Sequence, residues 1–143
     1  MQSPSLDPIA CGLPHREPFV FVDKIVALAP GVRATGTKTF HENEPFFRGH
    51  FPGDPLVPGV ILAEALAQTA GLAAGQPGRS FRLSAIKLMK FHRAVRPADE
   101  IVLSAEKSGE MEGLLQFRVE AQVRGEIVAE GVVVLSDAPV KSA

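Results

Sequence analysis

The chain has 143 residues, of which 45% are apolar and 22% are charged. This size and composition fit one globular domain over residues 1–143 and exclude a disordered chain, a collagen-like repeat and a pure coiled coil. The formal net charge is −1, so the chain lacks the excess of cations on which non-specific nucleic-acid binding depends. The single cysteine, Cys11, cannot form an internal disulfide, which fits a reducing cytoplasm.

No segment predicts secretion or membrane insertion. The first five residues are polar and lack the basic start and apolar core of a signal peptide. The longest apolar stretch, 60–74, is interrupted by Glu64, Gln68 and Thr69 and is shorter than the ~20 residues that a membrane span needs. We therefore expect no contact with a membrane.

The first half of the chain predicts a short helix, two strands and a long loop. A helix is expected over Leu6–Gly12, and runs rich in Val, Ile, Phe and Thr predict strands over Phe19–Leu28 and Val32–Phe40. The segment Glu44–Gly59 is dense in Pro, Gly and Phe. Its prolines lack amide donors, so it predicts a loop, and its phenylalanines need burial, so the loop should be ordered.

The second half predicts one buried helix followed by four strands. Pro58 suits the first turn of a helix over Pro58–Ala74, which Gly75–Gly78 would end. Apolar residues lie on nearly every side of this helix, which is typical of a helix inside the protein. Strand-like runs follow over 82–91, 100–108, 114–123 and 127–135, and the tail from Ser136 is expected to be frayed.

This order of elements predicts an α+β fold in which an antiparallel sheet wraps one long central helix. A single sheet leaves edge strands that must be paired or covered. A dimer that continues the sheet would satisfy this need.

Glu64 and Gln68 are candidate functional residues in the predicted helix. A buried carboxylate is costly to ionise, so burial would raise the pKa of Glu64 and suit it to act as a general acid. Gln68, one turn later, could orient it by a hydrogen bond. The alternative interpretation is a structural ion pair with an Arg or Lys of the sheet.

His50 and Gly59 complete the candidate site. Gly49, Pro52 and Gly53 shape the backbone around His50, whose imidazole suits a base near neutral pH. Gly59 stands at the helix N-terminus, where unpaired amides could stabilise a carbonyl oxygen that gains negative charge. The alternative for His50 is an ordinary loop histidine, and the alternative for Gly59 is a plain helix start. A base, an acid and an oxyanion site together predict proton abstraction α to a carbonyl with loss of a β-hydroxyl.

Two further sets of residues bear on metal binding and on partner binding. The four histidines are scattered without metal-ligand spacing, so no metal site is predicted. Basic residues cluster at the end of the third predicted strand and just after it, and they suit either a solvated face or a dock for an acidic partner: Lys87, Lys90, Arg93 and Arg96.

Several motifs resemble the 3-hydroxyacyl-(acyl-carrier-protein) dehydratases of bacterial fatty-acid synthesis. These are Leu13–Arg16, Asn43–Phe47 running on to Gly49–Gly53, Pro58–Val60 and Glu64–Gln68, supported by Lys90-Phe91 and Pro97-x-Asp99. The resemblance covers Leu13–Leu135, with the glutamate 14 residues after the histidine.

The resemblance implies a hot-dog fold, a cytoplasmic enzyme without cofactor or metal, and acyl carrier protein as partner. It implies a homodimer, and family members often assemble as trimers of dimers. His50 of one subunit would take the α-proton, and Glu64 of the other would protonate the leaving hydroxyl. The Gly59 amide would polarise the thioester carbonyl, and the Val60 carbonyl would orient His50. The acyl tail would occupy an apolar tunnel lined by Phe46, Phe47, Phe51 and Pro58.

This chain departs from the family pattern at some positions, and two other functions stay open. Ala98 replaces the glycine of a Pro-Gly-Asp turn, and Glu17 stands where the family often has Tyr. A hot-dog acyl thioesterase would act on similar thioesters by hydrolysis. A non-catalytic acyl-binding subunit would partner an active relative.

Overall fold

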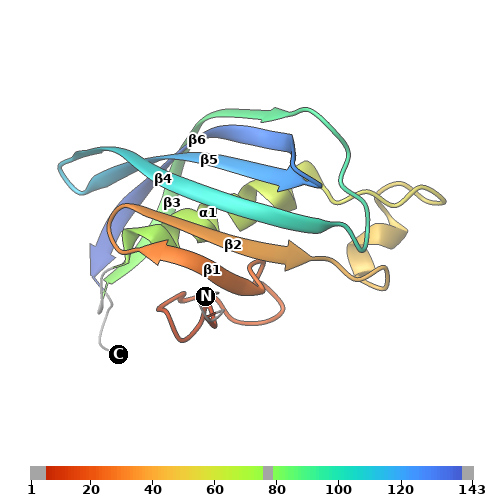
Figure 1. Cartoon of the computed structure of the whole chain (residues 1–143), viewed down its shortest axis with the longest axis horizontal. Coiled ribbons are helices and arrows are strands. Elements are labelled where there is room, and N and C mark those ends of the chain that lie inside the picture. Colours follow the sequence, from red (N-terminus) through yellow and green to blue (C-terminus); the bar gives the residue numbers. More distant parts are fainter. Residues whose placement is uncertain (1–5, 76–78, 140–143) are drawn as a thin grey trace.

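The computed structural model describes residues 6–75 and 79–139, and there the chain forms one antiparallel sheet around one long helix (Figure 1). The sheet order is β1-β2-β4-β5-β6-β3. The elements, in chain order, are β1 (Lys24–Ala29), β2 (Arg33–Thr39), the short 3₁₀ helix η1 (Pro45–Arg48), α1 (Gly59–Ala74), β3 (Arg79–Phe91), β4 (Glu100–Met111), β5 (Leu114–Val123) and β6 (Glu126–Pro139). The predicted α+β architecture is confirmed.

Helix α1 lies against the sheet and is buried over most of its length. Its apolar side chains, among them Leu62, Leu66 and Leu72, share one core with inward-facing residues of the strands. In β5 every second residue points inward, from Leu115 through Phe117 to Val123, which is the two-residue period of a strand with one buried face. Pro58 precedes the helix, and Gly75 ends it in the left-handed region with φ 50°.

Several boundaries differ from those expected. Residues 8–12 form turns, not a helix, and Leu6 makes an isolated bridge to Ile25. The first strand begins at Lys24 instead of Phe19, because the N–H of Phe21 bonds to the side chain of Gln68 and not to a neighbouring strand.

The tail expected to fray from Ser136 is instead part of β6 as far as Pro139. Ser136 pairs with Arg82 on one side and with Leu114 on the other, so cross-strand pairing stabilises a segment that its composition does not mark as strand. Residues 140–143 of the expected tail, and 76–78 of the expected helix stop, lie outside the described residues.

Strand β3 is one edge of the sheet and pairs only with β6 within the described chain. It is the strand with the most exposed surface, and several of its apolar side chains are open to solvent: Leu83, Ile86, Leu88 and Phe91. A long apolar edge strand of this kind needs a covering partner. No helix among the described residues is long and apolar enough to cross a membrane.

The turn before β4 contains a strained residue. Ala98 has φ 73°, a left-handed conformation that costs a residue with a Cβ roughly 1–2 kcal/mol. The conformation is held because the Ala98 N–H donates to the carbonyl of Phe40 at 2.9 Å. This is the position where the resembling family has glycine.

We expect Ala98→Gly to raise the free energy of unfolding by about 1 kcal/mol in urea denaturation, because glycine adopts this φ without the steric penalty. Ala27→Gly is the matched control. It lies at an exposed position of β1 with ordinary φ and should lower stability by about 0.5–1 kcal/mol. A loss of stability in Ala98→Gly like that of the control would contradict this view of the turn.

Candidate active site

Glu64 lies in the second turn of α1, with its carboxylate near two polar side chains. Its Oε2 accepts a hydrogen bond from Gln68 Nε2 at 3.1 Å and lies 3.5 Å from His15 Nε2. The Glu64 side chain keeps 22% of its surface exposed in the single chain, so it is less buried than the sequence led us to expect. The alternative of an ion pair with an Arg or Lys of the sheet finds no support, because among the described residues His15 is its only basic neighbour within ion-pair distance.

Gln68 holds the carboxylate in place and is itself fixed by the backbone of a distant segment. The residue is 1% exposed. Its Oε1 accepts from the N–H of Phe21 at 2.9 Å, and its Nε2 donates to the carbonyl of Phe19 at 3.0 Å as well as to Glu64. The amide therefore has one orientation that satisfies all three groups. The expected bond between Gln68 and Glu64 is present.

His15 is a site residue to which the sequence argument gave no role. Its ring stacks on Phe19, with centroids 6.2 Å apart and an interplanar angle of 22°. Its Nδ1 is buried without a hydrogen-bond partner among the described residues. In the sequence, only the position of His15 in the Leu13–Arg16 motif marks this residue. Nothing local in that motif shows that His15 lies next to a glutamate of the helix.

His50 lies in the loop before α1, away from these groups. Its Nδ1 lies 3.0 Å from the carbonyl oxygen of Leu56, and the Leu56 N–H donates back to the His50 carbonyl at 3.1 Å. The carbonyl that orients the ring is thus that of Leu56 and not, as expected, that of Val60. Because a carbonyl only accepts, Nδ1 carries the proton and Nε2 is left with a free lone pair, as a base requires.

Gly59 is the first residue of α1 and lies under an aromatic ring. The carbonyl of Pro58 accepts from the N–H groups of Ile61 and Leu62, so the amides of Gly59 and Val60 lie ahead of the helical bonding. A Cβ on Gly59 would come within 3.2 Å of the Phe91 ring. The glycine therefore allows Phe91, at the end of β3, to pack on the helix N-terminus.

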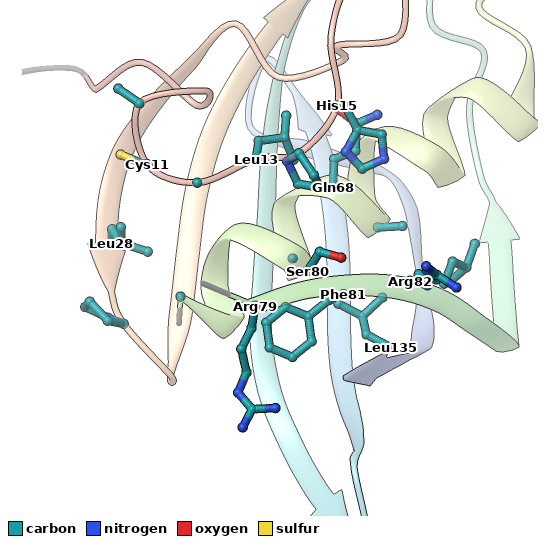
Figure 2. Close-up of a pocket in the computed structure, with 18 residues that line it drawn as sticks. Cys11, Leu13, His15, Leu28, Gln68, Arg79, Ser80, Phe81, Arg82 and Leu135 are labelled. Atoms are coloured by element: carbon teal, nitrogen blue, oxygen red, sulfur yellow. The ribbon is translucent and has the colours of Figure 1, made fainter. Parts of the chain in front are cut away.

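A cavity of about 710 Å³ lies beside Gln68, between the 10–15 segment, the second half of α1 and β3 (Figure 2). His15 and Gln68 line one part of it, and Phe81 and Leu135 line its wall on the side of β3 and β6. His50 does not line this cavity.

The residues expected to line an acyl tunnel do not line this cavity. Phe46 and Phe47 pack on each other and on the core, with Phe47 4% exposed. Phe51 is 54% exposed beside the ring of His50. Pro58 is the N-cap of α1. The cavity beside Gln68 is thus lined by the 10–15 segment, α1 and β3, and not by the Phe-rich loop.

Three of the four basic residues proposed as a dock already have partners. Lys87 donates to Gln116, Arg93 pairs with Glu126 at 3.0 Å, and Arg96 pairs with Asp54. Lys90 is exposed and has no carboxylate partner among the described residues. Over the same residues, no three His, Cys, Asp or Glu side chains lie close enough together to hold a metal ion.

Comparison with known families and sequences gives a consistent result. The model of the FabA-like domain matches residues 13–132. The 3-hydroxyacyl-(acyl-carrier-protein) dehydratase FabZ of Acetivibrio thermocellus is 46% identical over 123 residues, which cover 83% of this chain and 84% of the relative. That of Chloroflexus aggregans is 41% identical over 130 residues, covering 88% and 90%.

Solved structures share the fold at low sequence identity. The dehydratase heterocomplex ApeI:P from Xenorhabdus doucetiae aligns with a TM-score of 0.78 at 15% identity, covering 93% of this chain and 91% of that chain. The fluoroacetyl-CoA-specific thioesterase FlK aligns with a TM-score of 0.65 at 16% identity, covering 78% and 96%. A dehydratase complex and a thioesterase therefore share this fold, and these likenesses show the fold alone.

We expect Gln68→Leu to lower the free energy of unfolding by about 2–4 kcal/mol, because it leaves the Phe21 N–H and the Phe19 carbonyl without their partner. Chemical denaturation monitored by circular dichroism measures this. In the control Gln122→Leu, the lost amide bonds only to the part-buried side chain of Glu120, which water still reaches, so the change should stay within about 0.5 kcal/mol. Equal stability of Gln68→Leu and the wild type would contradict the proposed anchoring.

Proposed function

Since the chain belongs to the FabA-like family, we propose that it is a 3-hydroxyacyl-(acyl-carrier-protein) dehydratase, a hydro-lyase of fatty-acid or related acyl-chain synthesis. It converts a (3R)-3-hydroxyacyl thioester on acyl carrier protein to the trans-2-enoyl thioester and water. One observation carries this proposal: the buried amide that holds Glu64 itself lines a cavity large enough for an acyl chain.

In the proposed reaction His50 is the base. Its Nδ1–H donates to the Leu56 carbonyl, and Nε2 takes the proton from the carbon α to the thioester carbonyl. The electron pair of the broken C–H bond moves toward the carbonyl oxygen, whose developing charge is stabilised by the Gly59 amide at the positive end of α1.

Glu64 is the acid in this scheme. As the β C–O bond breaks, the carboxyl gives its proton to the departing hydroxyl, which leaves as water. The hydrogen bond that Oε2 receives from Gln68 holds the group in position, and this leaves Oε1 to donate to the substrate hydroxyl. After product release, one proton passes from the imidazolium of His50 back to the carboxylate of Glu64 by way of solvent, which restores both groups.

The proposal requires two protomers. His50 and Glu64 have separate polar partners, and no contact between them is present within the described chain. The exposed apolar side chains of β3 suit pairing with a second copy of this strand, and Val60, beside the helix N-terminus, is 78% exposed. A dimer across β3 would bring His50 of one protomer to Glu64 of the other.

The acidic carrier would dock on the basic residues near this edge. Lys87, Lys90, Arg93 and Arg96 lie on β3 and in the loop that follows it, close to Phe91 and hence to the helix N-terminus. Lys90 is the strongest candidate because no carboxylate of the described chain pairs with it. The proposal also places the enzyme in the cytoplasm, which the single cysteine supports.

We expect Glu64→Gln to lower kcat for dehydration by roughly 10²- to 10⁴-fold with the fold intact, because an amide cannot donate the acidic proton. The assay follows enoyl absorbance and free thiol together on a 3-hydroxybutyryl thioester. Glu42→Gln, an exposed loop residue, is the control and should match the wild type.

Thiol release without enoyl formation by the wild type would favour a thioesterase. Equal dehydration rates for wild type and His50→Ala would favour a non-catalytic acyl-binding subunit.

For carrier docking, Lys90→Glu and Arg93→Glu should each raise KM for a carrier-bound substrate by about tenfold, with little effect on a small thioester analogue. Only the carrier presents an acidic surface to these positions. Lys24→Glu makes the same charge change at an exposed position of β1, the opposite edge strand of the sheet, and should leave both substrates unaffected. An equal effect of Lys90→Glu on both substrates would contradict carrier docking and indicate that these residues form an ordinary solvated face.

A further inference from the structure

One face of helix α1 runs from the proposed catalytic acid along the cavity. Glu64, Gln68, Gly71 and Gly75 follow one another at spacings of four, three and four residues, which places them on one side of a helix. Gln68, Gly71 and Gly75 all line the cavity. At 1.5 Å rise per residue, Gly71 lies about 10 Å along the helix from Glu64, and Gly75 about 16 Å.

Gly71 has no structural explanation. Glycine inside a helix costs roughly 0.5–1 kcal/mol relative to alanine. Gly71 does not adopt a positive φ, and a Cβ built on it would meet nothing within 4 Å. Gly75 differs, because it has φ 50° and a Cβ there would meet Pro30 at 3.3 Å. Neither backbone conformation nor packing therefore requires glycine at position 71, and the space that a side chain would take belongs to the cavity.

We infer that Gly71 sets the length of acyl chain that this enzyme accepts, an inference that rests on the proposed function. The substrate hydroxyl must sit at Glu64, so the tail beyond it extends along α1 past Gln68. Apolar side chains from three segments, including Leu13, Phe81 and Leu135, line the space beside Gly71 and suit a hydrocarbon. The bare backbone at Gly71 leaves the width that a long tail needs.

The geometry also predicts which lengths of acyl chain a larger side chain at position 71 should affect. Carbon–carbon bonds are about 1.5 Å long, and an extended chain advances somewhat less than this per carbon. A tail therefore reaches Gly71 when it extends roughly eight or more carbons beyond the hydroxyl-bearing carbon. Butyryl and octanoyl substrates stop short of this point, and dodecanoyl substrates pass it.

The polar groups of the cavity do not compete for such a tail. Arg79 also lines the cavity, but its guanidinium pairs with Asp137 at 2.5 Å. Ser80 and Arg82, on the edge strand β3, line the same cavity. On the helix side the lining residues are Ala67, Gln68, Gly71 and Gly75, and the amide of Gln68 is already bonded to Phe19, Phe21 and Glu64.

The test compares kcat/KM for 3-hydroxybutyryl, 3-hydroxyoctanoyl and 3-hydroxydodecanoyl thioesters in wild type, Gly71→Ala and Gly71→Leu. We expect Gly71→Leu to lower kcat/KM for the dodecanoyl substrate by at least about tenfold relative to the butyryl substrate, since a pocket discriminates by roughly 10- to 200-fold per methylene. Gly71→Ala should give a smaller shift in the same direction and a higher melting temperature, which shows that the variants fold. Gly109→Leu, on β4 with its nearest neighbour 3.9 Å from the added Cβ, is the size-matched control and should leave the length profile unchanged.

The outcomes separate this inference from the proposed function. Equal losses for all three chain lengths, or an unchanged profile in both Gly71 variants, would overturn the role of Gly71 while leaving the dehydratase proposal intact. Failure of the wild type to dehydrate any of the three substrates would overturn the proposed function and this inference with it. Calorimetry with unreactive dodecanoyl and butyryl thioesters should show that Gly71→Leu weakens binding of the dodecanoyl thioester alone.

Discussion

The site is organised around the buried amide of Gln68. It joins two parts of the chain that lie far apart in sequence, helix α1 and the 19–21 segment before β1, and it also holds Glu64, one turn away on the same helix. Because the amide is 1% exposed, each of its bonds replaces water that cannot reach it, and the loss of one partner would leave a buried polar group unpaired. This cost fixes the rotamer of Gln68, and Gln68 in turn limits where the carboxylate of Glu64 can point.

The same bonds explain the shape of the cavity. The N–H of Phe21 is directed to Gln68 and not to a neighbouring strand, so β1 begins only at Lys24 and the chain before it lies over α1. That segment brings His15 to within 3.5 Å of Glu64 and forms one wall of the space beside the helix. Anchoring of the acid and formation of the acyl-sized cavity are thus consequences of one buried polar contact.

Much of this could be predicted from the sequence, and the rest could not for physical reasons. The all-round apolar character of α1, the alternation in β5 and the Gln68–Glu64 pair are local patterns, and the structure has them where they were expected. The role of His15 and the position of the cavity depend on how the N-terminal segment packs on the helix, and no local pattern encodes this. The Leu56 carbonyl at His50 likewise follows from the loop conformation, not from residue spacing.

The central claim is that each active site combines His50 of one protomer with Glu64 of its partner. Subunits carrying His50→Ala and subunits carrying Glu64→Gln, each inactive alone, can be unfolded together and refolded as a mixture. Random pairing should restore about a quarter of wild-type dehydratase activity, because half of the dimers are mixed and each of these holds one intact site. A mixture no more active than the two separate variants would contradict a shared site and place both groups within a single chain.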